Sequence, residues 1–334
     1  MGEKTCSTIK FGGVLKVSKL SRGGFALSLA VMVGLGLVLG AEPVLAAGRG
    51  YEKSIEPNGK SCKSDNDTDC FTLGVTNTPN SVLKNKIEQA KHKKSCDGGE
   101  PKGCTNIGWM YGEGNGVKQS YETAFTYYNQ ACEGGENGGC NNVGTLYEYG
   151  TGVYRDKEKA IEYYEKGCDG DVLQSCLNLG SIYRTYGSVV FFFKETDPSY
   201  MKAVTYYQKA CGGGEFEGCD SLGYLHLNGL GVEQDEEKAF GFYDEACKGG
   251  FDEGCLMLGM LYQEGTGVHE NPKKASELYQ LSCEKDIASG CSYAAEMYAH
   301  GKGVKKDKLK ALEFLQKACD FGLTKYCNIL KDMS

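Results

Sequence analysis

Cysteine pairs recur at fixed intervals along this chain, and they constrain its fold more than any other feature. Eight cysteines are each followed by a second one eight positions later, which gives the pairs Cys62 and Cys70, Cys96 and Cys104, Cys132 and Cys140, Cys168 and Cys176, Cys211 and Cys219, Cys247 and Cys255, Cys283 and Cys291, and Cys319 and Cys327. From Cys96 onward the pairs repeat every 36 residues, except for one interval of 43 residues. A fixed period of this size is typical of stacked repeats, in which no unit buries its apolar face alone. The 334-residue chain is therefore expected to form one elongated array rather than two ordinary domains.

The unit from Cys140 to Cys168 illustrates one repeat. Two runs with helical period lie on either side of Gly150–Gly152: Val143, Gly144, Leu146 and Tyr147, then Ala160, Tyr163, Tyr164, Gly167 and Cys168. The glycines break the first run, and Asp156 is suited to cap the second helix. The pattern predicts an all-α solenoid of about seven helix hairpins.

Small residues recur inside the predicted helices. Glycine stands four positions after the second cysteine of five pairs, and the sixth has alanine: Gly108, Gly144, Gly180, Gly223, Gly259 and Ala295. Glycine costs about 1 kcal/mol relative to alanine inside a helix. Its recurrence predicts that the backbone of a neighbouring helix passes close to this position.

The unit also carries a family resemblance. The pattern G-x-G-V-x-x-D-x-x-K-A-x-x-Y-Y-x-K-A-C, found with small departures at Gly150–Cys168 and Gly265–Cys283, resembles the Sel1-like repeat. With the added C-x₇-C pairs, the chain resembles the Helicobacter cysteine-rich protein (Hcp) family, whose members are described as putative β-lactamases. The resemblance covers about residues 62–330. It implies an exported, disulfide-bonded right-handed superhelix of helices, with penicillin binding and weak β-lactam hydrolysis.

The first 46 residues read as a signal peptide. Basic residues precede the apolar stretch Phe25–Leu39, and Val44 and Ala46 occupy the −3 and −1 positions of a cleavage site. A transmembrane anchor is the alternative, but the apolar run is short for a span. Cleavage after Ala46 would remove Cys6 and leave sixteen cysteines, an even number. In the periplasm or outside the cell, regular pairs are expected to form disulfides.

The remaining chain divides into a lead-in and the array. Residues 47–95 are expected to contain an unstructured segment and a degenerate capping repeat, and residues 96–334 the repeat array. An insertion near 185–200 accounts for the longer interval and includes the apolar run Val189–Phe193. This run could bind a partner or pack against the adjacent repeat.

The net charge and the catalytic motifs of the sequence narrow the range of functions that this chain could have. The leader carries five basic and two acidic residues, so its removal changes the net charge from −7 to −10, which disfavours nucleic acid and stable membrane association.

The S-x-x-K pattern of serine β-lactamases occurs at Ser81–Lys84, Ser199–Lys202 and Ser282–Lys285, without S-D-N or K-T-G. The histidines are scattered, and the cysteine spacing does not suit zinc. We therefore predict no metal or cofactor, and the catalytic residues, if any exist, are unknown.

A binding surface has better support from the residues. Asn106, Asn142 and Asn178 recur two positions after the second cysteine of successive pairs, and Trp109 lies on the same helix as Asn106. Asparagine offers both a donor and an acceptor to a peptide or carboxylate, although local hydrogen bonding is an equal alternative. The leading hypothesis is an exported scaffold that binds a protein, peptide or peptidoglycan-related ligand on its concave face. A β-lactam hydrolase and a structural protein without a ligand are the alternatives.

Overall fold

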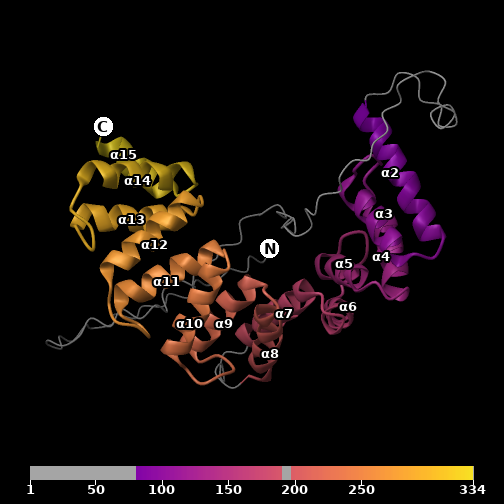
Figure 1. Cartoon of the computed structure of the whole chain (residues 1–334), viewed down its shortest axis with the longest axis horizontal. Helices are drawn as coiled ribbons and strands as arrows, with labels where there is room; N and C mark the ends of the chain where they lie inside the picture. Colours follow the sequence, from indigo (N-terminus) through magenta and orange to yellow (C-terminus); the bar gives the residue numbers. More distant parts are fainter. Residues whose placement is uncertain (1–79, 190–196, 334) are drawn as a thin grey trace, which may run out of the picture. The chain divides into compact units, whose positions relative to one another are not determined.

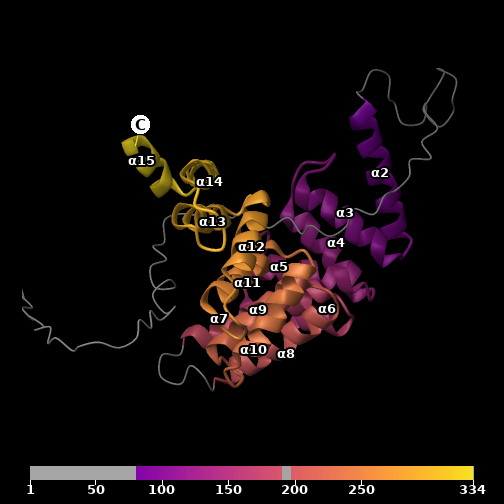
Figure 2. The same ribbon diagram turned by 60° about the vertical axis from the view of Figure 1, so that its left-hand side comes forward.

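The computed structural model describes residues 80–189 and 197–333. These residues belong to the unit Thr68–Ser334, and within them the chain forms fourteen α-helices and no strand (Figures 1 and 2). The helices are α2 (Asn80–Asp97), α3 (Pro101–Glu113), α4 (Tyr121–Glu133), α5 (Asn137–Tyr149), α6 (Lys157–Asp169), α7 (Leu173–Val189), α8 (Pro198–Gly212), α9 (Phe216–Asn228), α10 (Glu236–Lys248), α11 (Asp252–Glu264), α12 (Pro272–Glu284), α13 (Ala288–His300), α14 (Lys308–Asp320) and α15 (Thr324–Met333). The predicted signal peptide and most of the predicted lead-in lie outside the described residues.

Consecutive helices pair into the predicted hairpins. From α3 to α14, each odd-numbered helix is the first helix of a unit and each even-numbered helix is the second. Every helix packs mainly against the helices before and after it, with smaller contacts between the first helices of some successive units. This nearest-neighbour arrangement is that of a solenoid, and it confirms the predicted fold class.

Side-chain caps and glycines set the helix bounds. Asp156 caps α6 as predicted, because its Oδ1 accepts from the backbone N–H of Lys159 at 3.0 Å. Five first helices end at a glycine in the left-handed region, with φ between 63° and 74°: Gly114, Gly150, Gly229, Gly265 and Gly301. Glycine adopts this conformation without steric cost. The turn between the two helices is thus encoded locally.

The recurrent helix glycine lies against a tyrosine ring. A Cβ added to Gly144 would meet the ring of Tyr164 at 2.7 Å, and the other four glycines face the equivalent tyrosine in the same way: Tyr128, Tyr207, Tyr243 and Tyr279. The prediction of a neighbouring backbone was therefore wrong in its main point, because ring atoms are the nearest neighbours at all five glycines. These tyrosines are at most 7% exposed. Each ring fills the seam between the two helices of its hairpin.

Five of the six hairpins from α3 to α14 have a second aromatic contact between their two helices. The residue three positions after the recurrent glycine, or after Ala295 in the last of these units, stacks on an aromatic residue of the second helix: Tyr111 on Tyr127, Tyr147 on Tyr163, Tyr183 on Tyr206, His226 on Phe242, and Tyr298 on Phe314. His226 is 7% exposed, and burial lowers its pKa. The histidine thus packs in the core at a position that is tyrosine in other units.

Successive units touch through the second glycine of the G-x-G turn. Gly152 has φ 72°, and an added Cβ would meet the backbone of Tyr121 at 2.5 Å. Gly231, at the same place in a later unit, would meet the backbone of Tyr200. The turn of one unit therefore rests on the start of the second helix in the preceding unit.

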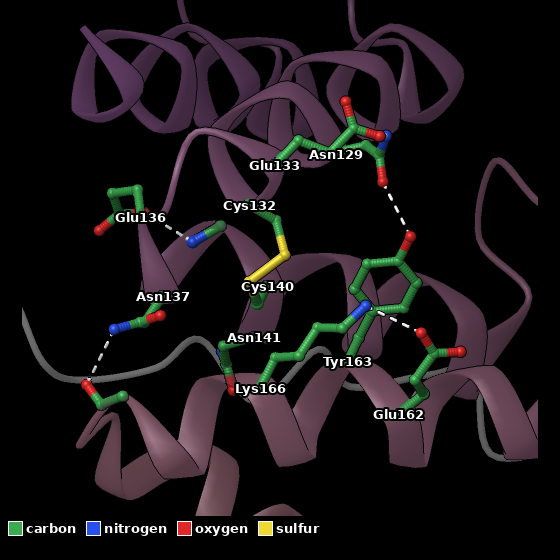
Figure 3. Close-up of a disulfide and its surroundings, with 12 residues drawn as sticks. Asn129, Cys132, Glu133, Glu136, Asn137, Cys140, Asn141, Glu162, Tyr163 and Lys166 are labelled. Carbon is green, nitrogen blue, oxygen red and sulfur yellow. Dashed lines mark hydrogen bonds and ion pairs between the residues drawn. A yellow bond between two sulfur atoms is a disulfide. The ribbon is translucent and has the colours of Figure 1, made fainter.

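Seven disulfides join the end of a second helix to the start of the next first helix. They bond the cysteine pairs from Cys96 and Cys104 to Cys319 and Cys327, as predicted. The predicted pair Cys62 and Cys70 lies outside the described residues. Figure 3 shows the Cys132–Cys140 bridge, beside which Tyr163 of α6 donates to Asn129 of α4 at 2.9 Å. At this corner the covalent bond is thus accompanied by a hydrogen bond between two second helices.

The predicted insertion lengthens two helices. α7 and α8 have 17 and 15 residues, whereas the other helices from α3 to α14 have 13. Gly187 of this extension lies against the ring of Tyr200, which is 1% exposed. Part of the insertion therefore continues the hairpin, while residues 190–196, which hold most of the apolar run, lie outside the described residues.

Candidate functional site

The predicted binding residues all come from the first helices of successive units. Asn106 and Trp109 lie on α3, Asn142 on α5 and Asn178 on α7. The three asparagines are half-buried, and Trp109 is 50% exposed. We call the surface that carries these four residues the first-helix face.

The asparagines have different partners despite their shared register. Asn178 donates to Asn141 of the preceding first helix at 3.4 Å and accepts from Gln174 at 3.2 Å. The side chain of Asn106 lies 3.4 Å from Nδ1 of His92 on α2. Asn142 has no side-chain hydrogen bond to another described residue. Two of the three amides are thus engaged within the protein, and the third has no side-chain partner among the described residues.

Trp109 and Asn106 are neighbours on one helix surface because they are three residues apart on α3. The positions equivalent to Trp109 are Thr145, Ser181, Tyr224, Met260 and Glu296. A half-exposed tryptophan at so variable a position is a large apolar side chain that the fold itself does not require.

Buried tyrosines fix other polar groups of the first helices. The hydroxyl of Tyr164 donates to Glu148 Oε2 at 2.7 Å and lies 3.1 Å from Thr145 Oγ1. Burial raises the pKa of Tyr164 above its usual value, and the nearby Glu148 adds to this rise. The hydroxyl of Tyr207 lies 3.2 Å from Ser181 Oγ, and that of Tyr279 donates to Gln263. The tyrosine that packs on the glycine therefore also orients side chains near the first-helix face.

The serines of the S-x-x-K patterns do not form a common site. Ser282 is completely buried and donates to the carbonyl of Leu278 at 3.0 Å. Ser199 lies in the first turn of α8, and the amino group of Lys202 lies 4.8 Å from the centre of the Tyr183 ring. The side chain of Ser81 lies outside the described residues. Nothing in the described geometry supports a serine hydrolase.

One group of metal-ligand residues lies close together among the described residues: Cys211, Cys219 and Glu245. The two sulfur atoms are bonded to each other in a disulfide, so neither is a free thiolate that could bind a metal. This cluster is explained by the corner between α8 and α9.

Asp220 of α9 is an unusual residue that the sequence patterns did not single out. Its Oδ1 is buried without a hydrogen-bond partner in the described part of the chain, and burial raises the pKa of the carboxyl to about 7. Glu253 and Glu217 raise it further, and Arg184 opposes them. A comparison of the repeats could have found it, because the equivalent positions hold Thr105, Asn141, Leu177, Leu256 and Ser292.

The Sel1 repeat model matches six successive segments, residues 101–136, 138–172, 173–215, 217–251, 252–287 and 288–322. The chain belongs to the Sel1 repeat family. The matched segments cover more than half of the chain and coincide with the hairpins from α3 to α14.

Solved structures agree with this assignment. A protective antigen present in uropathogenic Escherichia coli strains, with an SLR fold, matches at a TM-score of 0.65 and 25% identity over 71% of this chain and 50% of the antigen. The chain thus spans half the length of that protein. A Sel1 repeat protein from Oxalobacter formigenes matches at a TM-score of 0.59 and 26% identity, over 66% of this chain and 87% of the other.

The predicted Hcp resemblance is also confirmed. Helicobacter pylori cysteine-rich protein B is 32% identical over 38% of this chain and 92% of its own, with a TM-score of 0.33. No protein with curated annotation matches the chain.

The disulfides indicate the kind of cellular compartment in which the protein folds. Seven bridges within the described helices fit an oxidising environment, extracellular or periplasmic. None of the described helices has the length and apolarity needed to cross a membrane.

Proposed function

We propose that this Sel1 repeat protein is an exported scaffold that binds a protein or peptide on its first-helix face. The observation that carries the proposal is Trp109, which is the only tryptophan of the chain and is 50% exposed beside Asn106. Tryptophan buries a large area on binding and is enriched among the residues that dominate interface energies. The sequence predicts that this face is the concave one.

The asparagines supply polar recognition in this proposal. The amide of Asn142 is without a partner among the described residues, so it offers both a donor and an acceptor to a peptide backbone. Asn178 and Asn106 keep their intramolecular contacts and position the neighbouring helices. Ligand contact is therefore centred on α3 and α5.

The disulfides favour tight binding without large rearrangement. Each bridge fixes the angle at which one unit continues into the next, so a surface made of several first helices is already ordered before the ligand arrives. A preorganised surface loses less conformational entropy on association. Export, with removal of residues 1–46, would place the protein where these bridges form and persist.

The test uses the oxidised mature chain and a library of peptides and muropeptides. Because Trp109 is the only tryptophan, its fluorescence reports directly on ligands at the first-helix face. The ligand that changes this fluorescence is then titrated by isothermal titration calorimetry, which needs no tryptophan, against three variants: Trp109→Ala, Asn142→Ala and Tyr154→Ala. Tyr154 is a matched control because it is an aromatic residue that is 97% exposed and lies in a turn rather than on a first helix.

We expect Trp109→Ala to weaken peptide binding by roughly 30-fold, as for a residue contributing about 2 kcal/mol. Asn142→Ala should weaken it less, and Tyr154→Ala should leave it unchanged. Peptide binding that survives both first-helix substitutions would refute the proposed surface. Binding of muropeptides alone would point to a cell-wall ligand, and turnover of nitrocefin would point to the hydrolase implied by the family resemblance.

A further inference from the structure

The carboxyl of Asp220 lies within electrostatic reach of the first helices of both neighbouring units, through Glu253 of α11 and Arg184 of α7. Asp220 is on α9, next to Cys219, and α9 contacts α11 as well as α7, α8 and α10. Its Oδ1 is inaccessible to solvent and has no hydrogen-bond partner among residues 80–189 and 197–333. A buried carboxylate oxygen without a partner is costly, so this position calls for an explanation.

The equivalent residue of an earlier unit shows what is missing. Asn141 holds this position on α5, and its Oδ1 accepts from Ser175 Oγ at 2.9 Å and from Asn178 Nδ2 at 3.4 Å, both on α7. At the two corresponding positions of α11 the chain has Gly254 and Met257, which carry no donor side chain. The repeat therefore places a carboxyl group at a position where the next first helix supplies neither of these two donors.

The surrounding charges favour the neutral form of Asp220. Burial is the largest cause of its raised pKa, followed by Glu253 on α11 and Glu217 on α9, while Arg184 on α7 acts in the opposite direction. The Asp220 carboxyl in turn helps to raise the pKa of Tyr243 on α10. No charged group of α8 acts on Asp220 among the described residues. Glu217 also has a raised pKa, first through its own burial.

We propose that the packing of α9 against α11 depends on pH. The two helices pack closely when Asp220 is protonated, and their contact loosens when this carboxyl ionises. Ionisation would leave a negative charge beside Glu217 and Glu253, with one oxygen shielded from water. Separation of the two helices would hydrate that oxygen. Because each unit contacts mainly its neighbours, the loosening would be local to this junction.

The direction of the pH effect follows from the raised pKa of about 7, against a usual value of 3.8. Between these values the folded protein holds a proton that the unfolded chain has released. Stability from this group is therefore fully present below the usual pKa and is lost as pH rises through neutrality. Because of Asp220 alone, the equilibrium constant for unfolding should rise roughly tenfold for each pH unit between 5 and 7.

The experiment compares oxidised wild-type protein with Asp220→Asn and Asp220→Leu. Asparagine and leucine both occur at the equivalent positions of other units, as Asn141, Leu177 and Leu256, so the hairpin accommodates them. Glu313→Gln is the control, because Glu313 is exposed and lies on α14, away from the junction. Urea unfolding and amide hydrogen exchange are measured at several pH values between 5 and 8.

We expect wild-type protein and Glu313→Gln to lose stability on going from pH 5 to pH 8, and both Asp220 variants to lose much less. At pH 8 the amides of α9 and α11 should exchange faster in wild-type protein than in Asp220→Asn, while those of α5 should not differ. If the Asp220 variants keep the wild-type pH profile, or if the difference in exchange is spread evenly over the array, the proposal is wrong.

Discussion

The glycine and tyrosine of each hairpin act as one pair at the scale of single residues. Five units combine a glycine on the first helix with a buried tyrosine on the second. In the last complete unit the glycine is replaced by Ala295, and Leu315 stands where the tyrosine would be. A smaller side chain on the second helix thus leaves space for a methyl group on the first, so the two positions are coupled through packing.

Replacement of Gly144 by alanine tests this coupling. Alanine normally favours a helix by about 1 kcal/mol over glycine, but its Cβ would meet the Tyr164 ring at 2.7 Å. We expect Gly144→Ala to reduce the free energy of unfolding by roughly 1–3 kcal/mol, the usual cost of overpacking. Chemical denaturation of the oxidised protein measures the change.

The chain offers a matched control for this substitution. Gly241 lies in the middle of α10, where an added Cβ would come within 4 Å of no other helix of the described chain, so Gly241→Ala should stabilise the protein. The double variant Gly144→Ala with Tyr164→Leu should recover part of the stability lost by Gly144→Ala. Equal effects of alanine at Gly144 and Gly241 would contradict a specific contact with the ring.

Periodicity predicted which residues matter but not what they touch. The recurrence of glycine was visible in the sequence, whereas its partner tyrosine lies 20 residues away on another helix, or 27 residues away for Gly180. The three asparagines share a register, yet only Asn178 meets Asn141, because the opposing residues come from a neighbouring unit that differs in sequence. The sequence patterns also missed Asp220. Its buried oxygen lacks a partner because the neighbouring unit has no donor side chain at the corresponding positions of α11.

At the scale of helices, local signals determine the hairpin and its corners. Capping residues such as Asp156 and left-handed glycines such as Gly150 specify where helices begin and end. The disulfide pairs follow from spacing alone, because eight residues span the corner between two antiparallel helices. The contact of the second glycine of each G-x-G turn with the preceding unit was not predictable in this way, since it involves backbone about 30 residues earlier.

Removal of one bridge should have a cost set by the length of its loop. A disulfide closing so short a loop stabilises by about 2.5 kcal/mol on the chain-entropy estimate. We expect Cys132→Ala with Cys140→Ala to lower the free energy of unfolding by about this amount, as measured by denaturation under oxidising conditions.

The terminal bridge provides the comparison. Cys319→Ala with Cys327→Ala frees only α15, which packs on α14 and has no second helix of its own in the described chain. This variant should lose order in α15 with little effect on the rest of the array. A similar global loss of stability in both double variants would show that the bridges act through the whole chain rather than at their own corners.

At the scale of the whole molecule, stability is a sum over neighbouring units. The described helices contact mainly those next to them in the chain, so no single core spans the array. Arrays of this kind are most stable where a unit has neighbours on both sides. The solenoid was therefore predictable from the period, whereas the identity of the ligand was not, because it depends on the few exposed residues that vary between units.

Native-state hydrogen exchange tests this view of the array. At pH 5, where Asp220 is protonated, amides of α9 and α10 have neighbouring units on both sides and should be the better protected, whereas those of α15 should exchange fastest. Uniform protection from α3 to α15, with a single opening energy, would indicate a fully cooperative domain instead.

The placement of the bridges has one more consequence. Each of the seven encloses only its own corner, so hydrolysis of a peptide bond between Cys132 and Cys140 leaves the two pieces covalently joined. A nick in the Gly150–Gly152 turn lies inside none of the seven loops and yields two separate fragments. Outside the cell, where proteases act on exposed glycine-rich segments, the corners would therefore tolerate damage without loss of any unit.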